Sequence, residues 1–385
     1  MKTIEKKRLI WRNQLILAQP FHMKIVFFSL ALFFFWMLDS WKSIISNEVN
    51  PAESPKVFQP VTDSLITLVA VGDIMMGSNY PSDAYLPPKN SNLLDPVSTF
   101  IQSADVAFGN LEGTVLDKGG AVKSCSDPSK CYAFRQPTYF VDQLKAAGFD
   151  FLSVANNHMG DFGDEGRVNT QRVLKAAGIR YAGLEACPWD TLTVKGVKIG
   201  MVAVAPNNGC IKINEYARIK ELIRKLNGMC EIVILSFHGG AEGSSRTHIT
   251  RQTEMFYGEN RGNVYEMARI AIDAGADVVL GHGPHVTRAI DCYKGRFITY
   301  SMGNFCTYRQ FNLKGVSGMA PLFELTLRKD GSIKSGKVIS IKQLGEGGPV
   351  IDSVNGAWEQ IMSLTKADLP ELAVQFNADQ TFYFK

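Results

Sequence analysis

Residues 65–73 read LITLVAVGD, an apolar run of strand-forming residues that ends in Gly72 and Asp73. Similar runs rich in Val and Ile recur along the chain and alternate with amphipathic stretches of helical period, which predicts an α/β domain. The predicted strands are 65–71, 106–108, 151–154, 197–204, 232–237, 278–280 and 297–300, with a later hairpin of 322–327 and 337–343. The predicted helices are 139–147, 165–177, 215–226, 264–274 and 354–364.

The composition excludes several classes of protein. The 385 residues are 45% hydrophobic and 20% charged, which suits a chain with a sizeable core and not a disordered or fibrous one. Lys and Arg number 41 against 37 Asp and Glu, a formal net charge of +4. Because this excess is small and dispersed, we expect no nucleic-acid partner.

The N-terminal segment predicts a membrane anchor. Residues 25–38 read IVFFSLALFFFWML without a charge and follow the basic residues 1–24. With Trp36 and Trp41 at interface depth, we predict one transmembrane signal anchor over 25–45. Residues 1–24 would then be cytoplasmic and the rest of the chain extracytoplasmic, at the cell surface or in the periplasm. A cleaved secretory signal and a buried core helix are the alternatives.

The sequence after the anchor indicates a linker and then one main domain. Residues 46–64 are polar with three prolines, as in a semi-extended linker. The folded domain is expected over 65–345, with 346–385 as a C-terminal extension. Cys125 and Cys131 flank a short turn-forming loop and are predicted to form a disulfide in an oxidising compartment. The other five cysteines show no metal-binding spacing.

Short polar clusters follow the predicted strands, where open α/β sheets build their sites. Each cluster alone is explained by a helix cap or a turn. Together they share carboxylate, amide and imidazole groups, the ligands of a divalent metal pair that can activate water and stabilise the leaving oxygen of a phosphoryl ester. The clusters are Gly72-Asp73, Gly109-Asn110-Leu111-Glu112, Asn156-Asn157-His158, Ser236-Phe237-His238-Gly239-Gly240 and Gly281-His282-Gly283-Pro284-His285.

At these residues the chain resembles the CapA family of bacterial capsule (poly-γ-glutamate) synthesis proteins, which share the calcineurin-like metallophosphoesterase fold. The resemblance implies a four-layer αββα arrangement, a two-sheet sandwich flanked by helices, with a metal site at the strand ends. The matching segments are AVGDIMMGS (70–78), AFGNLEGTV (107–115), AAGFDFLSVANNHMGDFGDEG (146–166), SFHGGAEG (236–243), DAGADVVLGHGPHV (273–286) and YSMGNF (300–305).

The resemblance also implies roles for single residues. His158 matches the histidine that assists the leaving group, and Glu112 takes the place of the bridging carboxylate. Met75 stands where many phosphoesterases have a second metal histidine, the bridge is Glu and not Asp, and the final histidine pair is spaced GHxxH. We therefore expect Mn, Fe or Zn, with one ion held firmly and a second held more weakly. The implied metal ligands are Asp73, Glu112, Asn157, His238, His282 and His285.

Basic and polar residues near these motifs are candidates for substrate binding. Three arginines could each bind an anionic group of the substrate through two hydrogen bonds: Arg246, Arg261 and Arg288. The alternative is that they form surface or structural ion pairs. The stretch 257–262, which contains Asn260, is polar and glycine-rich. It is predicted either to face the substrate or to be a solvent loop.

The sequence thus predicts a membrane-anchored CapA-type protein that acts in synthesis, export or attachment of an anionic capsule polymer of the poly-γ-glutamate type. Its chemistry would be metal-dependent hydrolysis or transfer. Its partners would be the anionic polymer or a phosphoester substrate, the membrane, and synthase subunits within it. The alternatives are a non-catalytic polymer-binding component of a synthase complex and a general secreted metallophosphoesterase.

Overall fold

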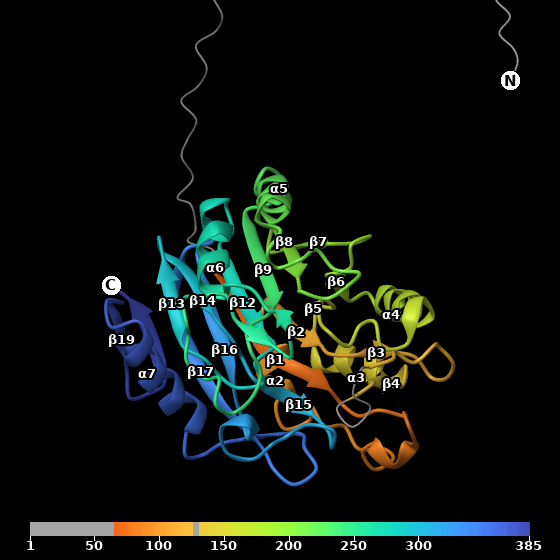
Figure 1. The fold of residues 1–385 in the computed structure, drawn as a ribbon. Helices are drawn as coiled ribbons and strands as arrows, with labels where there is room; N and C mark the ends of the chain where they lie inside the picture. The colour runs from red at the N-terminus through yellow and green to blue at the C-terminus, as the bar shows by residue number, and fades with distance from the viewer. Residues whose placement is uncertain (1–64, 126–130) are drawn as a thin grey trace, which may run out of the picture. The chain divides into compact units, whose positions relative to one another are not determined.

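Two β-sheets form the centre of the fold in the computed structural model, which describes residues 65–125 and 131–385 (Figure 1). The larger sheet runs, in spatial order, β19 (Val374–Phe376), β20 (Thr381–Phe384), β17 (Ile333–Gln343), β16 (Met319–Leu327), β1 (Ile66–Met75), β2 (Val106–Leu111), β5 (Phe151–Ser153) and β6 (Arg180–Ala182). In addition, β15 (Asn304–Thr307) pairs with β1, and β18 (Pro349–Ile351) pairs with β17.

The smaller sheet and two strand pairs complete the named strands of the described residues. The smaller sheet runs β13 (Ile290–Tyr293), β14 (Arg296–Thr299), β12 (Val278–His282), β9 (Ile232–His238), β8 (Val197–Val204) and β7 (Trp189–Val194). The two pairs are β3 (Thr114–Val115) with β4 (Arg135–Gln136), and β10 (Met255–Phe256) with β11 (Glu259–Asn260).

The two sheets pack face to face, with helices on both outer faces. Leu68 and Phe108 of the larger sheet share one buried cluster with Ile234 and Leu280 of the smaller. The outer face of the larger sheet packs against α2 (Ser98–Gln102), α3 (Tyr139–Ala147) and α4 (Gly163–Ala176). The outer face of the smaller sheet packs against α5 (Tyr216–Asn227) and α6 (Val264–Asp273). The predicted mixed α/β fold is therefore confirmed.

Strand β1 shows how the sequence places the site. Its side chains alternate between the interlayer core and the helix-covered face, and both faces are buried, so the strand is an almost continuous apolar run. It continues past the predicted end because Asp73 pairs with Asn304 of β15. Gly72 permits this approach, since a Cβ there would lie 2.0 Å from the carbonyl oxygen of Gly303. The pairing fixes Asp73 at the carboxyl end of the sheet.

Residues 346–385 add strands and a helix to the same unit. Helix α7 (Gly356–Asp368) buries Trp358 and Ile361 in the interlayer core. Strand β20 pairs with β17 of the larger sheet. Two short 3₁₀ segments, Asp83–Tyr85 and Gly315–Gly318, complete the helical elements of the described chain.

Two expectations concern the compartment. The predicted Cys125–Cys131 disulfide is confirmed, with 5.7 Å between the Cα atoms. The predicted anchor over 25–45, its basic flank 1–24 and the linker 46–64 lie outside the described residues. Among the helices of residues 65–125 and 131–385, none has the length and apolar character needed to cross a bilayer.

Candidate metal centre and its cavity

The polar clusters of the two sheets meet because they follow parallel strands. Asp73 pairs in register with Asn110 across β1 and β2. His238 and His282 stand opposite each other at the ends of β9 and β12. Since the carboxyl ends of neighbouring parallel strands share one edge of a sheet, residues distant in sequence are brought together there.

Asp73, Glu112 and His285 form the centre of the site. One potential ligand atom from each lies within 4.8 Å of those of the other two. Nδ1 of His285 is 3.0 Å from Oδ2 of Asp73, and its Nε2 is 3.6 Å from Oε1 of Glu112. Both carboxylates are completely buried. Two buried carboxylates beside an imidazole are a suitable donor set for a divalent cation.

Burial and close contacts shift the pKa of each of the three groups in this cluster. Burial opposes ionisation of Asp73, but its contacts with His282 at 3.5 Å and His285 at 3.0 Å, together with the charges of those two imidazoles, hold its pKa well below the usual range. Burial raises the pKa of Glu112, and the charge of Asp73 raises it further. Burial would lower the pKa of His285, yet Glu112 and Asp73 raise it to about 10. The cluster therefore favours positive charge between its two carboxylates.

Several buried polar atoms around this centre have no hydrogen-bond partner among the described residues. Buried polar groups are normally paired, so an unpaired set at one place points to a ligand. Burial and the charge of Arg261 lower the pKa of His238, which keeps its imidazole neutral, the state that binds metals. The residues present thus fit a divalent metal. The unpaired atoms are both carboxylate oxygens of Glu112, Oδ1 of Asn157, and both ring nitrogens of His238 and of His282.

His158 lies beside this centre, oriented by a carboxylate. Its Nδ1 is 2.7 Å from Oδ2 of Asp161, and its Nε2 lies 4.0 Å from Oε1 of Glu112. The ring of Phe134 stacks on it at 4.0 Å between centroids. Burial lowers the pKa of His158, although Asp161 opposes the shift. The contact with Asp161 favours a proton on Nδ1 and leaves Nε2 on the side of Glu112.

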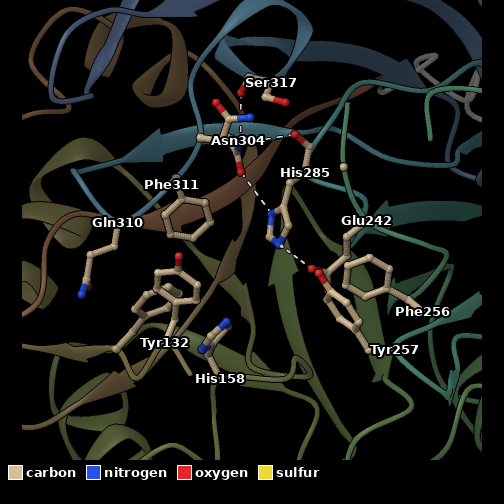
Figure 2. A pocket seen from close by; sticks show the side chains of 13 residues that line it. Tyr132, His158, Glu242, Phe256, Tyr257, His285, Asn304, Gln310, Phe311 and Ser317 are labelled. Carbon is tan, nitrogen blue, oxygen red and sulfur yellow. Dashed lines mark hydrogen bonds and ion pairs between the residues drawn. The ribbon is translucent and has the colours of Figure 1, made fainter. Parts of the chain in front are cut away.

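A cavity of about 410 Å³ opens onto these residues. His158, His285 and Glu242 contribute to its wall, and Figure 2 shows aromatic rings on both sides of the His285 imidazole. Its volume is in the range of small-molecule sites. The other lining residues are Tyr132, Phe134, Gly243, Phe256, Tyr257, Asn304, Gln310, Phe311, Asn312 and Ser317.

The predicted substrate-binding residues Arg246, Arg261 and Asn260 are not among those that line this cavity. Arg261 is buried, with Nη2 3.0 Å from Oε1 of Glu242 and Nη1 3.0 Å from Oε2 of Glu259. Arg246 is exposed and does not line the cavity. Asn260 is also exposed, and its Oδ1 accepts a hydrogen bond from the backbone of Gly262.

Arg288, the third predicted arginine, is fully buried and forms a structural ion pair. It donates to both carboxylate oxygens of Glu254 at 2.8 Å. The two buried guanidinium groups near the site are therefore engaged by carboxylates of the protein itself.

Three site residues escape the sequence prediction. Glu242 lies 3.9 Å from Nε2 of His285, Oδ1 of Asn304 lies 3.1 Å from Nδ1 of the same ring, and Asp161 orients His158. All three lie inside the segments that carry the family resemblance, and this position is the signal that could have identified them. Nothing in periodicity or composition distinguishes them from turn residues.

Comparison with known proteins finds one matching family model and several relatives. A family model described as "Bacterial capsule synthesis protein PGA_cap" matches residues 67–309. The capsule biosynthesis protein CapA of Bacillus anthracis is 27% identical over 259 residues, which cover 62% of this chain and 59% of that protein. The PGA biosynthesis protein CapA of Bacillus subtilis is 27% identical over 270 residues, 66% of each chain. The chain thus spans about three fifths to two thirds of these relatives.

Solved structures with a similar chain path are more distant. A hypothetical protein from Thermus thermophilus aligns with a TM-score of 0.46 at 15% identity, covering 72% of this chain and 100% of that one. A putative 5'-nucleotidase from Staphylococcus aureus aligns with a TM-score of 0.43 at 14% identity, covering 79% of this chain and 58% of that one. Likenesses at this level do not bear on the function of this chain.

Proposed function

Because the chain belongs to the bacterial capsule synthesis family PGA_cap, we propose that it is a metal-dependent phosphoester hydrolase or transferase in the synthesis, export or attachment of a capsule polymer. One observation carries the proposal. Asp73, Glu112 and His285 converge within 4.8 Å beside a cavity that His158 also lines.

The chain's own residues have separate tasks in this reaction. Asp73, Glu112 and His285 would hold the metal, with His238, His282 and Asn157 as further ligands. When bound, a divalent cation supplies positive charge for the phosphoryl oxygens and a water of lowered pKa. The protein contributes a buried site in which these charges act at low dielectric.

His158 would deliver the proton to the leaving oxygen. Its Nδ1 is fixed by Asp161 at 2.7 Å, so the ring cannot turn away from the centre. In the protein without substrate, burial keeps the pKa of His158 low. The negative charge of a bound phosphoryl group would raise that pKa, so that His158 gains a proton as the substrate binds and can give it to the leaving group.

Elemental analysis tests this proposal first. The purified protein should carry about one to two equivalents of Mn, Fe or Zn, and Glu112→Ala and His238→Ala should lose most of them. Loaded wild-type protein should then hydrolyse aryl phosphomonoesters or phosphodiesters, and His158→Ala should not. Folded wild-type protein that takes up none of these ions would exclude the metal site.

We further propose that residues 25–45 anchor the protein in the membrane and that the folded unit is extracytoplasmic. The Cys125–Cys131 disulfide supports this location, because cytosolic thiols are kept reduced. The substrate would be an anionic polymer of the poly-γ-glutamate type or a phosphoester precursor, and membrane synthase subunits would be the partners. Protease accessibility of the folded unit in intact cells tests the orientation.

A non-catalytic polymer-binding role is the second candidate. Met75 is completely buried at the end of β1, where the resemblance expects a metal-binding histidine. A thioether is a poor ligand for hard or borderline divalent ions, so a second ion would be held weakly. Bound metal with no turnover of any ester would favour this role.

A further inference from the structure

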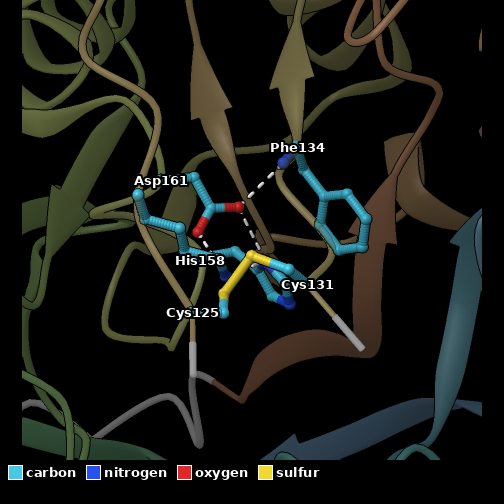
Figure 3. Close-up of a disulfide and its surroundings, with 6 residues drawn as sticks. Cys125, Cys131, Phe134, His158 and Asp161 are labelled. Atoms are coloured by element: carbon cyan, nitrogen blue, oxygen red, sulfur yellow. Dashed lines mark hydrogen bonds and ion pairs between the residues drawn. A yellow bond between two sulfur atoms is a disulfide. The ribbon is translucent and has the colours of Figure 1, made fainter. Parts of the chain in front are cut away.

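Both carboxylate oxygens of Asp161 are held by the chain on either side of the Cys125–Cys131 disulfide. Lys123, two residues before Cys125, donates its backbone N–H to the Asp161 carbonyl at 2.8 Å. Its Nζ lies 2.6 Å from Oδ1 of Asp161. Phe134, three residues after Cys131, donates its backbone N–H to Oδ2 at 2.7 Å. Figure 3 shows the disulfide together with Asp161, His158 and Phe134.

The same groups hold His158. The oxygen of Asp161 that accepts from Phe134 also lies 2.7 Å from Nδ1 of His158. The Phe134 ring stacks on the imidazole with 4.0 Å between the centroids. One carboxylate and one ring thus hold His158, and the residues that flank the disulfide on its two sides, Lys123 and Phe134, supply or support both.

We propose that the Cys125–Cys131 disulfide is a positioning element for His158, so that full turnover requires the oxidised cysteines. The proposal rests on the proposed function, in which His158 carries the proton. Phe134 has a further anchor, because its carbonyl accepts from the backbone of Thr114 at 3.1 Å. The Lys123 side chain is partly exposed, and its ammonium group can exchange Asp161 for water. Opening the crosslink should therefore release the Lys123 side first and loosen Asp161.

Reduction is chemically simple at this site. A dithiol reductant supplies two electrons and two protons, the sulfur–sulfur bond breaks, Cys125 and Cys131 become thiols, and the reductant becomes a disulfide. Both cysteines are half-buried, so a small dithiol can reach them.

The test uses the full chain, loaded with metal, and an aryl phosphoester as substrate. Cys125→Ser/Cys131→Ser should lower kcat about tenfold or more, because small displacements of a reacting group are costly, with KM and metal content within about twofold of wild type. Dithiothreitol should lower kcat of the folded wild type similarly and leave the double variant unchanged. Cys292→Ser, which removes a half-buried free thiol of β13, is the matched control and should behave as wild type.

Amide hydrogen exchange supplies a readout that does not need turnover. The Phe134 N–H, which donates to Asp161, should exchange at least tenfold faster in the double variant and in reduced wild type. Unchanged kcat in the double variant, or unchanged Phe134 exchange, would overturn the proposal. Faster exchange in a protein that turns over no ester would refute the proposed function, while leaving the hold of the disulfide on Asp161 established.

Discussion

Substitution of Arg288 tests whether this buried arginine beside the site binds a carboxylate of the protein or the substrate. Nη1 and Nη2 each lie 2.8 Å from one oxygen of Glu254, and the side chains are 0% and 4% exposed. The guanidinium also donates to the carbonyls of Ala241 and Arg246. Removing one partner of a buried ion pair costs about 3–5 kcal/mol, because the other charge stays in a medium of low dielectric. Arg288→Met should lower the free energy of unfolding by that amount.

The assay is urea denaturation of the single variants and the double variant. At about 2 °C per kcal/mol for a chain of this size, Arg288→Met should also lower Tm by about 6–10 °C. Arg288→Met/Glu254→Gln removes both charges and should lose at least about 1–2 kcal/mol less than the sum of the single variants. If the free energy of unfolding of Arg288→Met were within about 1 kcal/mol of wild type and its KM were raised tenfold, Arg288 would bind substrate. That result would refute the structural role of the ion pair with Glu254.

Three further predictions follow from the same structure. Metal at about 100 times its Kd should raise the free energy of unfolding by about 2.7 kcal/mol, which a chelator should abolish; a Tm insensitive to chelation would contradict the metal site. Burial raises the pKa of Asp277 from 3.8 to about 6, so its stabilising contribution is present below pH 3.8 and is lost as pH rises through 6. The stability advantage of wild type over Asp277→Asn should therefore shrink by about 2.4 kcal/mol between pH 4 and 7, and a constant difference in urea titrations would refute the shift. Arg246→Ala and Asn260→Ala should change KM less than twofold, because neither residue lines the cavity; a larger rise in KM would place them in contact with substrate.

The central strands are predictable from sequence because both of their faces are buried. β8, β9 and β12 are short apolar runs bounded by turns, and helices of clear period lie between them. The edge strand β7 escapes prediction, since each of its residues is exposed or only half-buried and its pairing with β8 defines it. β15 also escapes, because its four residues become a strand by pairing with the end of β1, far away in the chain.

Some residues of the site are likewise predictable from sequence and others are not. The polar clusters that follow the strands, together with the family resemblance, predict Asp73, Glu112 and the histidines, because the carboxyl ends of neighbouring parallel strands meet at one edge of a sheet. The arginines cannot be assigned in this way. A guanidinium is available to a substrate only if no carboxylate of the protein pairs with it. Glu254, which pairs with Arg288, is 34 residues away in the sequence, so the pairing follows from the tertiary fold.

The engagement of these arginines changes the electrostatics of the cavity. Glu242 lines the wall beside His285, and Arg261 lies 3.0 Å from it and offsets part of its charge, since the same guanidinium also contacts Glu259. That leaves Asp73 and Glu112 as two buried carboxylates that no lysine or arginine of the described chain contacts. Their nearest cationic partner is His285, a single positive charge at most. A cation of charge two is the group whose charge would balance them, so binding of a metal is the first requirement of this site and binding of a substrate the second.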